Sequence, residues 1–403
     1  MGDAAAPPPG RTPVQVRALV VLCIVLITHG SLYPWDIKVP ASFADAFADL
    51  MAQRNWWTSF GDVVGNVALF MPLGALWVWA RAGAPRARLR DWVLMLAGSI
   101  GFAFALQVLQ IYVPERDAAL SDVLWNAVGQ VLGVLLALGL RAPLRAAAMQ
   151  VGQTQRAPLA LIALWLALEW FPFVPTIDWQ NVKDALKPLL RDPQWNTHSA
   201  LDVALGLLVV AHFLRPWRRR GLILALLAVF AAIGKLFIAD QTISLPHAAG
   251  LVAGLLLAWL PWGRAPQRAG VLVFGVALLW FTADELRPFE LADQASTFHW
   301  IPFTALLEGS LSANVVAMGH AMFWLGAAMV LAAELGARLG MVAVGLGLWV
   351  LLLEALQTLL PDRQADLTVA LFPWFWVLVI GALSPVHPMP PSPPVRRRHR
   401  RRR

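Results

Sequence analysis

The chain has 403 residues, of which 59% are hydrophobic and only 14% carry a charged side chain. A soluble domain carries about 25% charged residues, so this composition argues against a soluble enzyme. The net charge of +8 would by itself suggest nucleic-acid binding, so the position of the basic residues decides what that charge means.

Apolar segments of about 20 residues, the length of a membrane-spanning helix, recur along the whole chain. The first follows Arg17 and shows no small-residue cleavage site after Leu32, so we interpret it as a retained helix rather than a signal peptide. It holds Cys23, the only cysteine, so no intramolecular disulfide can form. We predict an all-α membrane protein with twelve spans, centred near Ile24, Leu73, Ser99, Leu132, Leu164, Val209, Ala228, Leu251, Val276, Leu325, Gly347 and Trp376.

Basic residues gather in alternate loops, which predicts the orientation of the spans. With the N-terminal segment 1–15 in the cytoplasm, the inside segments hold most of the 32 basic residues. Of the acidic residues, only Asp3, Asp91 and Glu334 lie there. The Pro-rich, polybasic tail 385–403 is expected to be disordered and to contact anionic lipid rather than nucleic acid. We therefore expect a multi-pass protein of the bacterial inner membrane with both termini in the cytoplasm.

The chain also repeats itself in thirds. Each third begins with a helix that ends in a proline turn with aromatic neighbours, at 33–35, 171–173 and 287–289. The junction between the third and fourth helices aligns without a gap over 110–122, 235–247 and 357–369. We predict three four-helix units at 16–140, 158–262 and 269–384. Because each has an even number of spans, the repeats run parallel, and the aligned polar residues share the extracytoplasmic face.

Two stretches of the first unit resemble the VanZ-like family of bacterial membrane proteins. One is Asn66-Val-Ala-Leu-Phe70-Met-Pro72-Leu-Gly74, similar to the family's N-x-x-x-F-x-P-x-G signature. The other runs Gln107, Gln110, Pro114, Arg116, Asp122, Asn126, Gly129. The third unit adds Trp300-Ile301-Pro302-Phe303 and then Glu354, Gln357, Arg363, Asp366. The family takes its name from a teicoplanin-resistance protein, so the resemblance implies a role in the cell envelope without naming a reaction.

No unit carries the full polar set of that pattern. The first has Ala119 in place of an Asp, and the third has Val369 in place of another. The second has Gln241 in place of the Arg and His247 in place of an Asp. Either the units contribute groups to one shared site, or the second and third units are scaffold.

Arg116 and Arg363 are the leading candidates for ligand contact, because a guanidinium group binds carboxylate or phosphate with two parallel hydrogen bonds. The alternative is that each forms a local ion pair, with Asp122 or Asp366. Gln107 with Gln110, and Glu354 with Gln357, share helix faces and could orient hydroxyl groups. Asn66 and Asn126 could do the same or bond between helices.

The secondary candidates are Asp62, Lys235, His198, Asp202 and His247. Lys235 should either reach the interface or pair with Glu169, Asp202 or Asp240. His198 and His247 could handle protons together with Asp202, although His247 follows a proline at a helix start and could simply cap that helix. The sequence shows no metal-binding or cofactor-binding motif, so we expect neither a metal nor a cofactor.

Our leading hypothesis is binding of an amphiphile at the extracytoplasmic leaflet, either a lipid-linked glycan or a phospholipid head group. A transporter or flippase, and a non-catalytic scaffold for envelope-polymer assembly, are the alternatives. The expected partners are membrane lipids and no nucleic acid. The sequence leaves open whether a reaction follows binding and which oligomer forms.

Overall fold

The computed structural model describes residues 14–53, 55–57, 59–81, 88–150, 153–260, 266–308 and 311–383. Of the predicted terminal segments, 1–15 lies outside these residues except for its last two, and 385–403 lies wholly outside. Within the described residues the regular structure is helical, with no β-strand and only the isolated bridges Pro175–Ile238 and His299–Asp366.

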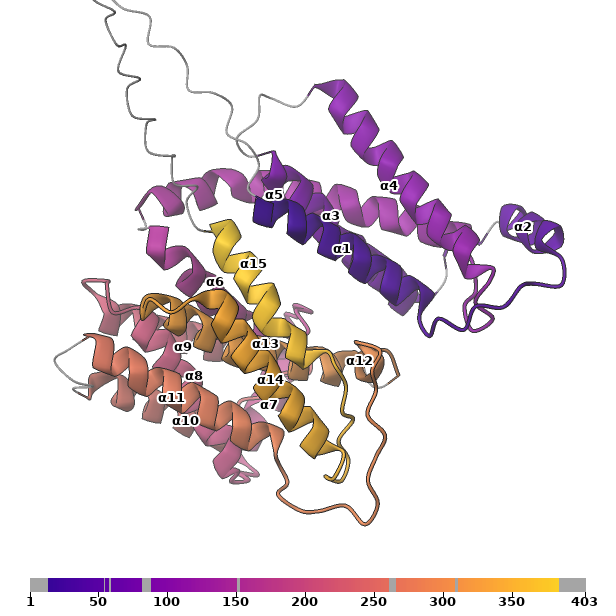
Figure 1. Ribbon diagram of the computed structural model, residues 1–403. Coiled ribbons are helices and arrows are strands. Elements are labelled where there is room, and N and C mark those ends of the chain that lie inside the picture. Colours follow the sequence, from indigo (N-terminus) through magenta and orange to yellow (C-terminus); the bar gives the residue numbers. More distant parts are fainter. Residues whose placement is uncertain are drawn as a thin grey trace, which may run out of the picture.

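The N-terminal body is a bundle of four long helices (Figure 1). Its helices are α1 (Val14–Leu32), α3 (Phe60–Ala80), α4 (Leu89–Gln110) and α5 (Leu120–Gln150), with the short α2 (Phe43–Ala52) between α1 and α3. Ser59 and Asp62 form a capping box that starts α3. Phe70, Ile27 and Leu106 form the centre of a small apolar core.

Glycines allow α3 and α5 to pack backbone to backbone, and among the described helices this pair has the most extensive contact. A Cβ atom on Gly129 would overlap the backbone of Val67, and one on Gly133 would overlap the carbonyl of Met71. The two glycines are spaced as in the Gly-x-x-x-Gly motif of membrane helix pairs. The sequence analysis did not use this motif.

The C-terminal body contains the remaining helices around one continuous apolar core (Figure 1). Leu161, Leu207 and Leu325 are among its fully buried residues. The elements are η1 (Gln153–Gln155), α6 (Arg156–Glu169), α7 (Trp179–Leu190), α8 (Thr197–Phe213), α9 (Arg220–Lys235), α10 (Leu245–Trp259), α11 (Pro266–Glu285), α12 (Thr304–Glu308), α13 (Leu311–Glu334), α14 (Leu339–Gln357), η2 (Val369–Leu371) and α15 (Phe372–Leu383).

Two contacts join the bodies, one at each end of α1. Val16 and Leu19 of α1 pack against Ala382 of α15. At the other end, His29 Nε2 lies 2.7 Å from the carbonyl oxygen of Pro302. The first helix is therefore in contact with the last third of the chain at both ends.

All twelve predicted span centres lie in helices of the structure. In the part of the chain that the structure describes, six helices are long and apolar enough to cross a membrane: Val14–Leu32, Gly61–Ala80, Leu89–Gln110, Leu120–Ala142, Ala313–Glu334 and Leu339–Gln357. Large apolar side chains such as Val25, Leu94 and Leu135 lie exposed on the outer faces of α1, α4 and α5. Lipid rather than water suits such surfaces, so the chain is a membrane protein.

The helices of residues 156–259 are shorter than predicted. They have 14, 17, 16 and 15 residues. At 1.5 Å per residue they extend about 21–26 Å, against about 30 Å of hydrocarbon. The apolar residues of α6 and α8 are largely buried in the shared core, whereas α9 and α10 also expose large apolar side chains such as Leu226 and Leu256. A hydropathy pattern does not distinguish burial in a core from exposure to lipid.

Candidate functional site

The side chain of Arg116 binds the end of α1. Its Nε atom donates to the carbonyl of Tyr33 at 2.7 Å, and its Nη2 atom donates to the carbonyl of Gly30 at 3.0 Å. The last carbonyls of a helix have no partner within the helix, and a cation there also complements the helix dipole. Arg116 is thus a helix cap. The described residues show no ion pair between Arg116 and Asp122, so that expected pair is not formed.

Arg363 repeats this arrangement at the end of α11. Its Nε atom donates to the carbonyl of Arg287 at 3.0 Å and its Nη2 atom to that of Asp284 at 2.6 Å. Asp366 accepts instead from the backbone N–H groups of Ala305 and Thr368, so the expected Arg363–Asp366 ion pair is not formed either. Both arginines use two of their nitrogen atoms to bind carbonyls at helix ends, so fewer N–H groups are left to bind a ligand.

Gln110, Lys235 and Gln357, which align in sequence, are all buried, and they bind the ends of α1, α6 and α11 respectively. Gln110 Nε2 donates to the carbonyl of Ser31 at 2.8 Å, and Gln357 Nε2 donates to Glu285 Oε2 at 2.5 Å. Lys235 Nζ lies 3.2 Å from Glu169 Oε2, which confirms Glu169 as one of its expected partners.

Gln107 and Glu354 hold the chain that enters the next helix. Gln107 Oε1 accepts the N–H of Ala119 at 2.7 Å, and Glu354 Oε2 accepts the N–H of Asp366 at 3.1 Å. These two candidates, which the resemblance suggested for ligand contact, have a structural partner at the same place in each unit.

A polar group in the N-terminal body combines three predicted site residues. The carboxylate of Asp122 lies within interaction range of the side chains of Asn66 and Gln107. Asn126 lies one turn further along α5 and is 3% exposed, and its Oδ1 atom has no hydrogen-bond partner among the described residues. Asp62 adjoins this group, since its charge acts on Asp122, while its carboxylate accepts from Ser59 in the capping box.

His247 belongs to a buried cluster at the end of α6. Its Nε2 atom lies 2.9 Å from Glu169 Oε2, the atom that also contacts Lys235. The expected group of His198, His247 and Asp202 is therefore wrong, because His247 pairs with Glu169 while the other two residues have different partners.

A second cluster, which we call the outer His–Asp cluster, lies between α8, α11 and α13. Its members are His198, Asp202, Trp280, Asp284 and His320. Trp280 Nε1 donates to Asp202 Oδ1 at 2.8 Å, and His320 Nδ1 lies 3.5 Å from Asp202 Oδ2. His198 Nε2 lies 2.7 Å from Asp284 Oδ1, as an ion-pair contact without hydrogen-bond geometry, and the His198 ring stacks on Trp280.

The four ionisable side chains of this cluster are partly exposed, with between 18% and 36% of the surface of each accessible. Carboxylates accept hydrogen bonds and imidazoles can donate or accept them, so the cluster can bind a ligand rich in hydroxyl groups or transfer a proton. Among the described residues, no three His, Cys, Asp or Glu side chains are arranged to hold a metal ion.

Of this cluster, only His198 and Asp202 are among the residues predicted from the sequence. Asp284 lies three residues before the proline-turn residue Arg287, and His320 lies in the apolar segment of α13. Ionisable residues inside apolar segments are a functional signal in membrane proteins. Applied to every span, that signal would also have found Asp284 and His320.

Residues 17–141 match a family model described as VanZ/LLP1. The matched range runs from α1 into α5 and includes the polar group of Asn66, Gln107, Asp122 and Asn126. No curated protein and no solved structure matches the chain. Residues 17–141 of this membrane protein are therefore a VanZ-like domain.

Proposed function

We propose that the protein is a twelve-helix component of the bacterial inner membrane, built from three related four-helix units at 16–140, 158–262 and 269–384. Equivalent hydrogen bonds support the three units. Arg116, Gln241 and Arg363 align in sequence, and each donates to the carbonyl of the residue before the proline of its turn. The residue after that proline has a positive φ in all three turns, at 68°, 62° and 64°.

We further propose that it binds the head group of a lipid-linked glycan or phospholipid at the extracytoplasmic end of its helices. The observation that carries this proposal is the outer His–Asp cluster, which lies within apolar helices and is only partly covered. Ionisable side chains in such segments are costly and are retained mainly for function. The capping role of Arg116 and Arg363 moves the proposed contact from these arginines to the carboxylates.

Hydroxyl groups of a sugar or glycerol head group would donate to Asp202 and Asp284 and accept from the histidines. Asn66, Asp122 and Asn126 of the VanZ-like domain offer a second group of the same chemistry. A histidine oriented by a carboxylate is also the composition of a general acid–base pair, so the same cluster could serve a reaction on the bound head group.

Lipidomics of the purified full-length protein tests the proposal. Lipids that co-purify with the wild type are compared by mass spectrometry with those of Asp202→Asn and Asp284→Asn variants. The matched control is Asp192→Asn, an exposed residue outside the cluster. We expect one lipid class to be enriched in the wild type and the control and lost in both cluster variants. An identical lipid profile in all four proteins would contradict the proposal.

Lipid transport is a second candidate function, favoured by one observation. Helices α8, α11 and α13 carry the outer His–Asp cluster at one end and line a pair of cavities at the other. A packed apolar layer that includes Leu207, Val210 and Leu325 separates the two ends, so the conformation described is closed.

Liposomes that contain the protein and a fluorescent lipid test transport. A membrane-impermeant quencher removes the fluorescence of the outer leaflet, which is about half of the signal. A greater loss of fluorescence would show that labelled lipid crosses the bilayer. Crossing that Asp202→Asn abolishes would favour transport over binding. If the cluster variants keep the co-purifying lipids of the wild type and still function in the cell, the result would favour the non-catalytic scaffold.

A further inference from the structure

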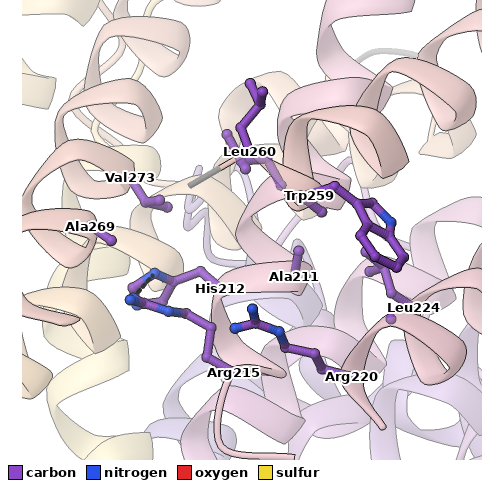
Figure 2. A pocket seen from close by; sticks show the side chains of 12 residues that line it. Ala211, His212, Arg215, Arg220, Leu224, Trp259, Leu260, Ala269 and Val273 are labelled. Atoms are coloured by element: carbon purple, nitrogen blue, oxygen red, sulfur yellow. Dashed lines mark hydrogen bonds between the residues drawn. The ribbon is translucent and has the colours of Figure 1, made fainter. Parts of the chain in front are cut away.

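Two adjoining cavities lie in the C-terminal body at the end opposite the outer His–Asp cluster. Their volumes are about 240 Å³ and 810 Å³. His212, Arg215 and Arg220 line both cavities. Figure 2 shows the smaller one, with the side chains of Arg215 and Arg220 extending into the same space beside His212.

Hydrogen bonds determine the charges around the cavities. Arg215 Nη1 lies 3.1 Å from His212 Nδ1, and His212 Nε2 lies 3.1 Å from Glu334 Oε2. A guanidinium group only donates, so Nδ1 accepts and the imidazole proton is on Nε2, where it donates to Glu334. Among the described residues that line the two cavities, Glu334 is the one carboxylate, and it lies on the same side-chain network as Arg215, one of the two arginines that line both cavities.

The two guanidinium groups repel each other. Burial lowers the pKa of Arg215, and the positive charge of Arg220 lowers it further. Arg220 forms no ion pair and no side-chain hydrogen bond with any residue that the structure describes. Two cations that share a space lined by apolar side chains are favourable when an anion lies between them.

The rest of the smaller cavity's lining is apolar, and the larger cavity adds Thr154, Gln155 and Gln267 to a mostly apolar wall. Leu208, Leu224 and Val273 line the smaller cavity, and Ile380 and Leu383 line the larger. The larger volume falls within the range of about 300–1,000 Å³ that is usual for small-molecule sites. A charged group beside apolar walls fits a molecule with an anionic head and a hydrocarbon tail.

We infer that the two cavities bind a phosphate-bearing amphiphile, with its phosphate between Arg215 and Arg220 and its chain in the larger cavity. The loop 214–219 belongs to the end of the helices that the distribution of basic residues predicts to be cytoplasmic, so the ligand would enter from that leaflet. This site is separate from the outer His–Asp cluster and does not depend on what the cluster binds.

Native mass spectrometry of the full-length protein in detergent tests the inference, with dioleoyl phosphatidic acid as the probe. We expect Arg220→Gln to weaken binding by about tenfold, the effect of losing one charge-assisted hydrogen bond. Arg218→Gln is the matched control, because Arg218 is exposed in the same turn and lines neither cavity, and it should bind as the wild type does. Equal weakening in both variants would show surface attraction only and would overturn the inference.

Three further arms identify the source of the phosphate and guard against misfolding. Dioleoylglycerol, which has the chains without the phosphate, should not bind. Inorganic phosphate that displaces the lipid from the wild type but not from Arg220→Gln would show a site for phosphate itself. Gly270→Leu places a side chain in the larger cavity, so it should weaken binding of the lipid but leave binding of inorganic phosphate unchanged. If Arg220→Gln fails to fold, Arg220→Lys keeps the charge without the planar fork and should bind at an intermediate level, whereas unchanged binding would overturn the inference.

Discussion

Lys235 Nζ lies 3.2 Å from Glu169 Oε2, and only 11% of each side chain is exposed. The same position in the other thirds of the chain joins Gln110 to the backbone of Ser31 and Gln357 to Glu285. In each predicted unit, one side chain at the end of the third helix therefore binds the end of the first helix. The interaction is an ion pair in the second unit, a hydrogen bond to a backbone carbonyl in the first, and a hydrogen bond to a carboxylate in the third.

Lys235→Met should destabilise the protein by about 3–5 kcal/mol, because it leaves the buried Glu169 carboxylate without its cation. Lys235→Gln should cost less, since glutamine at the aligned position 357 donates to a glutamate in the same way. Unfolding in mixed micelles, followed by tryptophan fluorescence, measures both free energies. Equal losses in the two variants would contradict the equivalence of positions 235 and 357.

Arg116→Ala should lower the free energy of unfolding by at least about 1.5 kcal/mol, because two carbonyls at the end of α1 lose a charged donor. Arg116→Lys should recover part of this loss, since lysine cannot reproduce the planar fork. Arg363→Ala should behave alike at the end of α11. The co-purifying lipids should not change in any stable variant. A stable Arg116→Ala protein that loses its lipid would return Arg116 to the ligand site.

Gly133→Ala should destabilise the VanZ-like domain by about 1–3 kcal/mol, because the new Cβ atom would overlap the carbonyl of Met71 and push α3 and α5 apart. Gly139→Ala, two turns further along α5, is the matched control. Nothing lies within 4 Å of a Cβ atom there, so alanine should stabilise the helix by about 0.5–1 kcal/mol. Thermal unfolding in one detergent compares the pair, and effects of the same sign would contradict the close packing.

Cysteine labelling tests the predicted orientation. In a Cys23→Ala background, Ile177→Cys places a thiol on a side chain that is 98% exposed, in a segment expected outside the cell. Arg218→Cys places one in a turn expected inside. A membrane-impermeant maleimide should label position 177 in intact spheroplasts and position 218 only after permeabilisation. The reverse pattern would invert the topology and exchange the leaflets of the two proposed sites.

The helices could be predicted from the sequence because each carries its own apolar signal. The twelve predicted centres all lie in helices. The lengths in residues 156–259 could not be predicted, because burial inside a shared core and exposure to lipid require the same residue types. Only the packing shows that Leu161 and Leu207 face other helices.

The partners of the polar residues were harder to predict for a physical reason. Arg116 and Arg363 bind carbonyls at the ends of α1 and α11, which appear in a sequence only as the end of an apolar run. An arginine near an aspartate in the sequence suggests an ion pair. Unpaired carbonyls at a helix end can bind the same guanidinium N–H groups, and here they do. Likewise, the approach of His198 to Asp284 depends on how α8 packs on α11, which no local pattern contains.

The apolar layer between the outer His–Asp cluster and the cavities also acts as an electrical barrier. Asp202 and His212 lie on one helix, about 15 Å apart along its axis, and Leu207, Val209 and Val210 between them are fully buried. One elementary charge that crosses a membrane potential of 100 mV exchanges about 2.3 kcal/mol. The described side chains of this layer are apolar, so we expect the protein to hold ionisable groups at both ends of its helices without conducting protons between them. A cell that produces it in quantity should therefore keep its membrane potential.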